Sequence, residues 1–463
     1  MSTDPAFLSA RDLLVQFRAR TLSPLEALEA VLKRLAADNP ELNAFHLVDV
    51  EMGRRMAKAS EARWMKGEPI GALDGVPVSI KDTNAAKGWP FRIGSKTTSP
   101  DPVDYDGPPV ARLREAGAVF FGKTTTPEFG WKGVTDSPLT GITRNPWDKT
   151  KTPGGSSGGA VVAVACGIGP IALGGDGGGS IRMPCGFTGV YGIKPTAGRA
   201  PNVPSPSVGT MTTPGPIARN VRDAALTLRV LAGADWRDPT ALPPPDIDFL
   251  AGPEEGLKGV RIAFSANLGY APVEPEVAET VAAAMRVFAE CGAVVEAADP
   301  GFADPRWALD TIWRVAYATM LRNLTKEQRA LLDPDLAAVV ESGRAISAVD
   351  YHHAFNERVR LGEAMQLFHQ RYDLMVTPAL PLTAFTAGTL MPDRKKYPEW
   401  WDWSPFTWPF NMTRQPAAVC PCGFSREGLP IGLQIVGPLY RDDLVLRASR
   451  AFEAARPFKM PRG

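Results

Sequence analysis

The chain has 463 residues, with 51 Lys and Arg against 50 Asp and Glu and a formal net charge of +1. Hydrophobic residues make up 44% and charged residues 22%, which is typical of a globular protein and excludes a disordered chain. Gly and Pro number 44 each without a Gly-X-Y period, so a collagen-like chain is also excluded. Because a nearly neutral chain has no global field that attracts polyanions, we expect neither a nucleic-acid nor a membrane partner.

The thiols and the N-terminus indicate a cytoplasmic location. The first residues lack the basic start and apolar stretch of a secretory signal, and the most apolar stretch, residues 160–175, is interrupted by Gly and Pro. Five cysteines are an odd number in a long chain and indicate reduced thiols rather than a disulfide framework. Since the chain has four histidines and no H-E-x-x-H motif, we expect no metal and no other cofactor.

Periodicity predicts alternating helices and strands. Residues 7–37 have apolar side chains at helical spacing, with Ser9 and Ser23 as N-caps. A short apolar run at 76–82, bounded by turn residues, predicts a buried strand with Lys81 near its end. Further elements are predicted as helix 110–116, strand 118–121, helix 221–231, strand 260–264 and helix 277–288. Such alternation indicates an α/β fold.

The domain organisation is predicted from the same patterns. We expect residues 1–70 to form a helical arm packed on the core, and residues 71–463 to form one α/β domain that is a single unit with the arm. Three consecutive prolines at 243–245 favour an extended spacer. Because strands and helices resume after them, we interpret this segment as a surface connection inside one large unit.

Two short motifs match familiar patterns but have unsuitable surroundings. Residues 117–124 match the phosphate-binding pattern G-x-x-x-x-G-K-[ST], yet the four internal residues are a strand-like apolar run, so we do not expect nucleotide binding. Residues 155–159 match the nucleophile elbow G-x-S-x-G, yet a polar, proline-containing segment precedes them where an elbow needs a buried strand. A flexible linker also fits poorly, since the apolar run 160–166 follows at once.

A glycine-rich run at 174–179 ends in Ser180. Glycines allow close approach of the backbone to a ligand, and converging N–H groups beside a serine hydroxyl are what acyl transfer requires. A tight glycine turn with an incidental serine is the alternative. No histidine lies between His46 and His352, so a base other than histidine is implied. A buried lysine can act as a base once its pKa falls from about 10.4, although Lys81 paired with Asp82 in a salt bridge stays open.

With these motifs the chain resembles the amidase signature family, whose characteristic stretch is similar to residues 154–195. The lysine strand 78–82, the loop 154–159 and the segment 179–182 occur in the family order, and the resemblance extends over nearly the whole chain. It implies an α/β fold with a single large mixed β-sheet covered by helices on both faces. It also implies Ser180 as nucleophile, Ser156 on a cis peptide as bridging serine, and Lys81 as base, with an acyl-enzyme intermediate.

The resemblance assigns further roles. The backbone amides of Gly177, Gly178 and Gly179, with that of Ser180, would form the oxyanion hole. Supporting residues around the triad would be Ser157, Asp176 and Arg182. Three positions depart from the family pattern: Gly177 stands where a β-branched residue is usual, Ala160 where serine is frequent and Arg414 where glycine is common.

The substrate is predicted from an aromatic segment. Residues 400–410 contain six aromatic side chains, which either cap the core or form an apolar wall for an aryl or bulky substrate. Candidate pocket residues are Trp131, Thr377, Trp408 and Gln415. We expect hydrolysis of aryl or bulky acyl amides, with carbamates (urethanes) and esters as close variants.

Alternative functions stay open at this point. The glutaminase component of a tRNA-dependent amidotransferase would use the same triad, and a non-catalytic binding module is the third candidate. The expected partner is a small-molecule amide or carbamate substrate, and a homodimer stays open.

Overall fold

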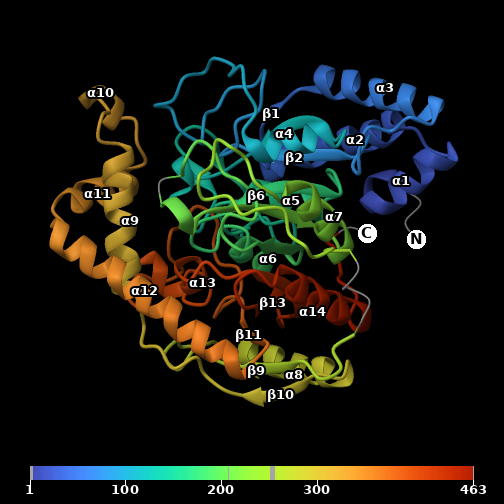
Figure 1. The fold of residues 1–463 in the computed structure, drawn as a ribbon. Helices are drawn as coiled ribbons and strands as arrows, with labels where there is room; N and C mark the ends of the chain where they lie inside the picture. Colours follow the sequence, from blue (N-terminus) through green and yellow to red (C-terminus); the bar gives the residue numbers. More distant parts are fainter. Residues whose placement is uncertain (1–3, 207, 251–255, 462–463) are drawn as a thin grey trace.

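The computed structural model describes residues 4–206, 208–250 and 256–461. Within them, one sheet of eleven strands runs through the molecule in the order β1-β3-β2-β6-β8-β7-β12-β13-β11-β9-β10 (Figure 1). Its strands are β1 Phe45–Val48, β2 Pro77–Lys81, β3 Val119–Thr124, β6 Ile171–Asp176, β7 Tyr191–Lys194, β8 Thr213–Ala218, β9 Arg261–Phe264, β10 Val294–Ala297, β11 Leu374–Pro378, β12 Ala417–Phe424 and β13 Pro430–Val436. A separate ribbon pairs β4 Asp136–Ser137 with β5 Gly141–Ile142.

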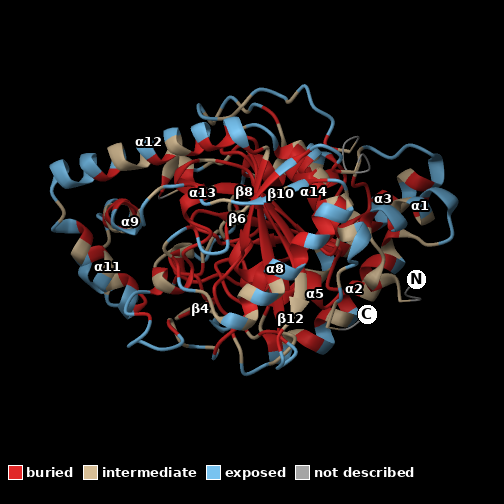
Figure 2. Cartoon of the chain, turned by 90° about the horizontal axis from the view of Figure 1, so that it is seen from below, coloured by how far each residue is buried: buried red, intermediate tan, exposed pale blue. Residues whose placement is uncertain are grey.

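Helices cover both faces of this sheet. The described helices are α1 Ala10–Ala19, α2 Pro24–Leu42, α3 Val50–Lys66, α4 Pro108–Glu115, α5 Gly158–Ala165, α6 Arg182–Thr188, α7 Val221–Leu231, α8 Pro275–Glu290, α9 Arg306–Met320, α10 Lys326–Arg329, α11 Pro334–Arg344, α12 Ala348–Arg371, α13 Pro409–Met412 and α14 Asp442–Ala455. Helices α2, α5 and α6 share one core cluster, and α7, α8 and α14 share another. The central strands are buried and the outer helix surfaces are exposed (Figure 2).

The sheet is mixed, and its parallel part positions the site. Strand β2 lies between β3 and β6 and is parallel to both. The carboxyl ends of these strands therefore meet at one edge of the sheet, where ligands bind in open α/β sheets. Lys81 ends β2 and Asp176 ends β6, so both side chains reach this edge.

Most elements expected from periodicity are confirmed, and so is the α/β class. Ser9 caps α1 by accepting from the Asp12 N–H, and Ser23 caps α2 in a capping box with Glu26. The predicted strand around Lys81 is β2, and the apolar run of the phosphate-binding pattern is β3. The prolines at 243–245 lie in a segment without helix or strand, as expected for a surface connection. The helices α9 to α12 were not expected individually.

The N-terminal arm is joined to the sheet and to its helices. Strand β1 extends the sheet by antiparallel pairing with β3, and the Ala10 N–H donates to the buried carboxylate of Asp223 over 2.8 Å. Arg219 donates to the carbonyls of Leu8 at 2.8 Å and Gly169 at 2.9 Å, so one side chain links the arm to the core. The boundary at residue 70 stays a prediction.

None of the described helices, including the 24-residue α12, combines the length and the apolar composition that crossing a bilayer requires.

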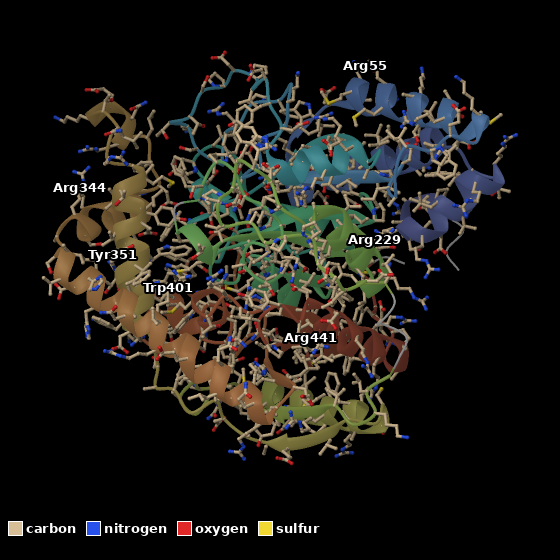
Figure 3. The ribbon with its side chains drawn as sticks, viewed as in Figure 1. Arg55, Arg229, Arg344, Tyr351, Trp401 and Arg441 are labelled. Carbon is tan, nitrogen blue, oxygen red and sulfur yellow. The ribbon has the colours of Figure 1, made fainter. Side chains whose placement is uncertain are left out.

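Replacing Arg219 by alanine is expected to loosen the arm. The guanidinium also donates to the carbonyls of Ala6 and Val164, so its removal takes a donor from four carbonyls, of which Val164 still accepts from the Gly167 N–H. We expect Arg219→Ala to lower the free energy of unfolding by about 3 kcal/mol in urea denaturation. Arg229→Ala is the matched control, since this exposed side chain lies on the outside of α7 (Figure 3), and unchanged stability of Arg219→Ala would contradict the link.

Candidate active site

The Lys81 side chain lies almost fully buried at the end of β2. Its Nζ donates to Ser156 Oγ over 2.7 Å and to the Gly175 carbonyl over 3.2 Å. Burial lowers the pKa of Lys81 to about 7, although the negative charge of Asp176 acts in the opposite direction. A large fraction of this amine is therefore neutral near pH 7, and a neutral amine can accept a proton.

Lys81 forms no salt bridge with Asp82 in the described residues. The Asp82 carboxylate lies 2.7 Å from Lys123 Nζ and 3.3 Å from His46 Nε2. Lys123 belongs to residues 117–124, which match the phosphate-binding pattern without suitable surroundings, and its side chain is buried in this ion pair. The pattern is therefore part of the sheet.

The loop that carries Ser156 is held closely against the core. Thr135 Oγ1 donates to the Gly154 carbonyl over 2.8 Å and accepts from the Gly158 N–H. A Cβ at Gly155 would lie 2.6 Å from the Val134 carbonyl oxygen, so only glycine allows this approach. The peptide bond between Gly155 and Ser156 is cis. Helix α5 begins at Gly158, but a turn segment rather than a buried strand precedes the loop, which excludes a nucleophile elbow.

Ser180 follows β6 at the end of the glycine run. The Ser157 N–H donates to the Ser180 carbonyl over 3.0 Å and thereby joins the two serine loops. The Ser157 hydroxyl lies 3.3 Å from the Gly175 carbonyl oxygen, to which Lys81 also donates. Within the described residues, a hydrogen bond joins Lys81 to Ser156 but none joins the two hydroxyls of Ser156 and Ser180.

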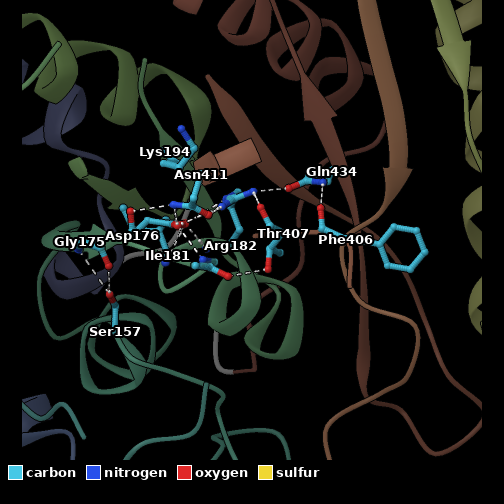
Figure 4. Close-up of polar contacts among 12 residues, drawn as sticks. Ser157, Gly175, Asp176, Ile181, Arg182, Lys194, Phe406, Thr407, Asn411 and Gln434 are labelled. Carbon is cyan, nitrogen blue, oxygen red and sulfur yellow. Dashed lines mark hydrogen bonds and ion pairs between the residues drawn. The ribbon is translucent and has the colours of Figure 1, made fainter. Parts of the chain in front are cut away.

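Asp176 organises the glycine run through its carboxylate (Figure 4). Oδ1 accepts from the Gly179 N–H over 2.7 Å, and Oδ2 accepts from the Ile181 N–H over 3.1 Å. Arg182 donates to both carboxylate oxygens at 3.0 Å, and both side chains are fully buried. Burial alone would raise the pKa of Asp176, but the charge and hydrogen bonds of Arg182 outweigh it and hold the pKa well below its usual range.

A second layer of polar groups surrounds Arg182. Its guanidinium donates to Asn411 Oδ1, to Gln434 Oε1 and to the Thr407 carbonyl. Thr407 Oγ1 in turn donates to the Gly178 carbonyl over 2.9 Å, and Asn411 Nδ2 donates to Asp176. Every polar atom of the Arg182 fork therefore has a partner, which is what a buried charge requires. Sequence reasoning did not single out these three partners, because they lie more than 220 positions away along the chain.

The amides of the glycine run differ in availability. The Gly179 N–H already donates to Asp176, and Gly179 has a φ of 123° that favours glycine. The amides of Gly177 and Gly178 have no acceptor among the described residues. Gly177 lines the cavity described next, so its amide is suited to meet a ligand oxygen.

A cavity of about 420 Å³ contains all three candidate catalytic side chains, Lys81, Ser156 and Ser180. One wall is the loop 91–98, a second is α9 with Trp313 and Tyr317, and a third is formed by residues 202–206 together with Val208. The other lining side chains are mainly apolar or uncharged: Thr83, Asn84, Phe91, Ile93, Thr97, Thr98, Phe129, Asn202, Pro204, Ser205, Pro206, Val208, Thr212, Pro214, Met320, Leu321 and Leu324. Lys81 is the one ionisable side chain among the described lining residues other than the phenol of Tyr317.

The four residues predicted for the substrate pocket do not line this cavity. Trp131 and Trp408 are buried in the aromatic core cluster. Thr377 lies in β11 and accepts from Gln434 Nε2, while Gln415 contacts His369 and the Gly437 carbonyl. Their side chains satisfy internal hydrogen bonds or fill the core instead. The α9 residues of the cavity were missed, and their signal was the aromatic pair at i and i+4, Trp313 and Tyr317.

The tryptophan-rich segment is packing behind the site, not its wall. Trp400, Trp401 and Trp403 are buried. The Trp401 ring meets that of Trp313 edge to face at 4.9 Å, and both rings lie beside Gly178. The segment therefore caps the core, as one of the two interpretations expected. It contacts the cavity wall through Trp313.

The three departures from the family pattern have visible surroundings. Arg414 has a φ of 69°, in the left-handed region where glycine is favoured. A Cβ at Gly177 would lie 2.8 Å from Thr212 Oγ1, so this loop has no room for a β-branched residue unless Thr212 moves. Ala160 is buried in the first turn of α5.

In the described part of the chain, no group of three His, Cys, Asp or Glu side chains is placed to hold a metal ion. None of the five cysteines, all of which the structure describes, forms a disulfide.

Comparison with known proteins agrees with this geometry. The chain matches the family described as Amidase over residues 26–446. An acylamidase of Rhodococcus erythropolis is 37% identical over 98% of this chain and 96% of the relative. A component of the glutamyl-tRNA(Gln) amidotransferase of Roseiflexus castenholzii is 33% identical over 96% of this chain and 94% of its own.

Solved structures give the same result. A bacterial aryl acylamidase of the amidase signature family has a TM-score of 0.90 at 32% identity, covering 97% of this chain and 96% of its own. A 6-aminohexanoate cyclic dimer hydrolase, solved with its substrate, has a TM-score of 0.89 at 30% identity, covering 98% of each chain. The chain therefore belongs to the amidase signature family of carbon–nitrogen hydrolases.

Activity is expected to depend on pH through Lys81. Because the pKa of Lys81 is lowered to about 7, the amine becomes protonated as the pH falls below 7, and its deprotonation is nearly complete above pH 8. We expect kcat/KM to fall about tenfold per pH unit on the acid side and to level off on the alkaline side. Lys81→Arg should abolish this activity, because guanidinium stays protonated, whereas Lys395→Arg on the exposed surface should not alter the profile. A flat profile from pH 6 to 9 would contradict a lysine base.

Removing the charge of Asp176 is expected to destabilise the fold. Asp176→Asn keeps an acceptor for the Gly179 N–H but leaves the buried Arg182 without its counter-ion. We expect a loss of about 3–5 kcal/mol in the free energy of unfolding, measured in urea. Asp246→Asn at an exposed position is the control, and an equally small effect of both substitutions would refute the role of the pair.

Proposed function

We propose that this protein is a serine amidase with the triad Ser180, Ser156 and Lys81. In the proposed reaction, Lys81 accepts the proton of Ser156 while Ser156 accepts that of Ser180, and the Ser180 oxygen attacks the substrate carbonyl. The leaving amine takes a proton back through Ser156. Water then hydrolyses the acyl-enzyme by the same proton path, which regenerates the free Ser180 hydroxyl and releases the carboxylic acid.

The hydrogen bond from the desolvated Lys81 amine to Ser156 is the observation that carries this proposal. A lysine with a pKa of about 7 can exchange a proton with a hydroxyl at neutral pH. The second link, between the hydroxyls of Ser156 and Ser180, is proposed to form within the cavity that both side chains line. A catalytic hydrogen bond is often completed only when substrate is bound.

The oxyanion is proposed to meet the glycine run. The amides of Gly177 and Gly178, together with that of Ser180, are the suited donors, while the Gly179 amide is used by Asp176 to fix the loop. Preorganised donors of this kind stabilise a developing negative charge strongly in a site that excludes water. Ser157, Asp176 and Arg182 act by holding this loop and need not touch the substrate.

The substrates are proposed to be neutral amides with an aryl or bulky acyl group. The walls of the cavity include Phe91, Phe129, Trp313 and Tyr317, which suit an aromatic or large apolar group. The acylamidase of Rhodococcus erythropolis and the solved aryl acylamidase, both similar over nearly the whole chain, support this class. Carbamates and esters present the same carbonyl to the same donors, and we include them as secondary substrates.

A glutaminase role has a specific observation in its favour and another against it. Relatives named as components of glutamyl-tRNA(Gln) amidotransferases match nearly the whole chain, with about the same coverage as the acylamidase. Free glutamine, however, carries an α-carboxylate and an α-ammonium group, and the described lining offers no carboxylate and only Lys81 as a cation. Burying such charges without partners is costly, so we favour the amidase. We also propose a cytoplasmic location, in line with five cysteines that form no disulfide in the described residues.

Covalent labelling tests the nucleophile. An aryl phosphonate or sulfonyl fluoride should form one adduct, located at Ser180 by peptide mass spectrometry, and Ser180→Ala should lose both the adduct and turnover. Ser156→Ala should retain a trace of activity, because the nucleophile remains while its proton path is broken. Ser404→Ala, at a buried serine that does not line the cavity, is the control. An adduct at another residue, or full turnover by Ser180→Ala, would refute the assignment.

A substrate panel tests the substrate class. We expect anilides to be cleaved and free glutamine to be left intact, with carbamates and esters of the same aryl group cleaved more slowly or to a similar extent. If glutamine were the one substrate cleaved, and only after partner chains were added, the glutaminase function would be supported and the amidase function refuted.

A further inference from the structure

Two of the three walls of the substrate cavity, the loop 91–98 and α9, are separate pieces of chain. One wall is the loop 91–98, which contributes Phe91, Ile93, Thr97 and Thr98. The other is α9, which lies with α11 and α12 at one side of the molecule (Figure 1) and contributes Trp313 and Tyr317 among others. The width of the cavity between them depends on what fixes each wall to the body.

A short segment between them, residues 128–132, contacts both walls. The Phe129 N–H donates to the Ile93 carbonyl over 2.8 Å, which holds the loop. The Phe129 carbonyl accepts from the Tyr317 hydroxyl at 3.1 Å, and the Trp131 carbonyl accepts from Trp313 Nε1 at 3.2 Å. Two aromatic side chains of the α9 wall are therefore hydrogen-bonded to this segment.

Glu128 is the member of this segment whose side chain contacts both sides. It is fully buried. Its Oε1 accepts from Ser95 Oγ over 2.6 Å, on the loop, and its Oε2 accepts from the Asp333 N–H over 2.6 Å, at the start of α11. Ser95 is in turn 2.8 Å from the hydroxyl of Thr97, a lining residue. One carboxylate thus links the loop 91–98 to the start of α11, the helix that packs on α9.

The surroundings of Glu128 disfavour its ionised form. Burial raises the pKa of Glu128, although the hydrogen bonds from the Asp333 N–H and the Ser95 hydroxyl act in the opposite direction. The Asp333 carboxylate raises this pKa further, and Lys132 lowers it. Lys132 bridges Asp333 and Asp136 at 2.8 and 2.6 Å. Neither Glu128 nor this ion-pair cluster contacts Lys81, Ser156 or Ser180 in any described hydrogen bond, so the triad chemistry does not account for it.

We propose that Glu128 is a positioning residue that couples the loop 91–98 to the α9–α11 helices and thereby sets the size of substrate that the cavity accepts. The inference rests on the proposed amide hydrolysis at this cavity. It assigns Glu128 no contact with the reacting atoms. Its effect is on the binding of groups large enough to reach both walls.

The test compares a small and a bulky substrate. Glu128→Ala leaves the Ser95 hydroxyl and the Asp333 N–H without their acceptor, and should raise KM for a bulky anilide about tenfold. Acetamide does not span the walls, so its kcat/KM should stay within about twofold of wild type, and the pH dependence through Lys81 should not move. An equal loss for both substrates, or no loss for either, would overturn the proposal.

Conservative variants separate positioning from folding. Glu128→Gln retains an acceptor for the Asp333 N–H and a polar group for Ser95, so it should restore most of the bulky-substrate KM. Ser95→Ala removes the contact of Glu128 with the loop, together with the bonds of Ser95 Oγ to Thr97, and should raise the same KM about threefold. If Glu128→Ala does not fold, Ser95→Ala tests the coupling in its place, because an unchanged KM for the bulky anilide in Ser95→Ala would refute the coupling. Glu68→Ala, at an exposed position, is the matched control and should behave as wild type.

A binding measurement distinguishes this inference from the proposed function. In the Ser180→Ala background, calorimetry with the bulky anilide measures affinity without turnover, and Glu128→Ala should weaken it by about the same tenfold. If wild type binds the anilide without cleaving it, the proposed hydrolysis fails while the coupling is still tested. If Glu128→Ala binds as tightly as its parent, the coupling fails while hydrolysis stands. A wild-type protein that neither binds nor cleaves the anilide contradicts both.

Discussion

The site depends on one hydrogen bond, that from Lys81 Nζ to Ser156 Oγ at 2.7 Å. An amine in water is protonated at neutral pH and cannot accept a proton. Burial at the end of β2 removes the solvation that favours the ammonium form and lowers the pKa to about 7. The position of β2 inside the sheet, between β3 and β6, is what keeps water away from this nitrogen. The fold therefore creates the base.

The negative charge of Asp176 opposes the effect of burial on Lys81. The same sheet edge carries the Asp176 carboxylate, whose charge favours protonated Lys81. Arg182 neutralises this carboxylate through two hydrogen bonds, and Asn411 adds another. The pair also fixes the glycine run, because the Gly179 N–H donates to Asp176. One buried ion pair thus stabilises the loop and limits the field acting on the lysine.

The parts that the sequence predicts are those encoded locally. A short apolar run bounded by turns is enough to place Lys81 on a buried strand, and a glycine run ending in Ser180 marks a loop that approaches a ligand. The cavity walls were not predictable in this way. Trp313 reaches the site from about 130 positions beyond Ser180, and its packing on Trp401 depends on the tertiary fold. The tryptophans at 400–403 looked equally suited to bind a substrate, and only the fold shows that they support Trp313 instead.

The central claim is that Lys81 carries a neutral amine near pH 7. The most direct measurement is an NMR titration of protein with isotope-labelled lysine side chains, in which Lys81→Arg identifies the Lys81 signal by its loss. The account predicts a titration with a midpoint near 7. A midpoint close to the usual lysine value of about 10.4 would contradict it.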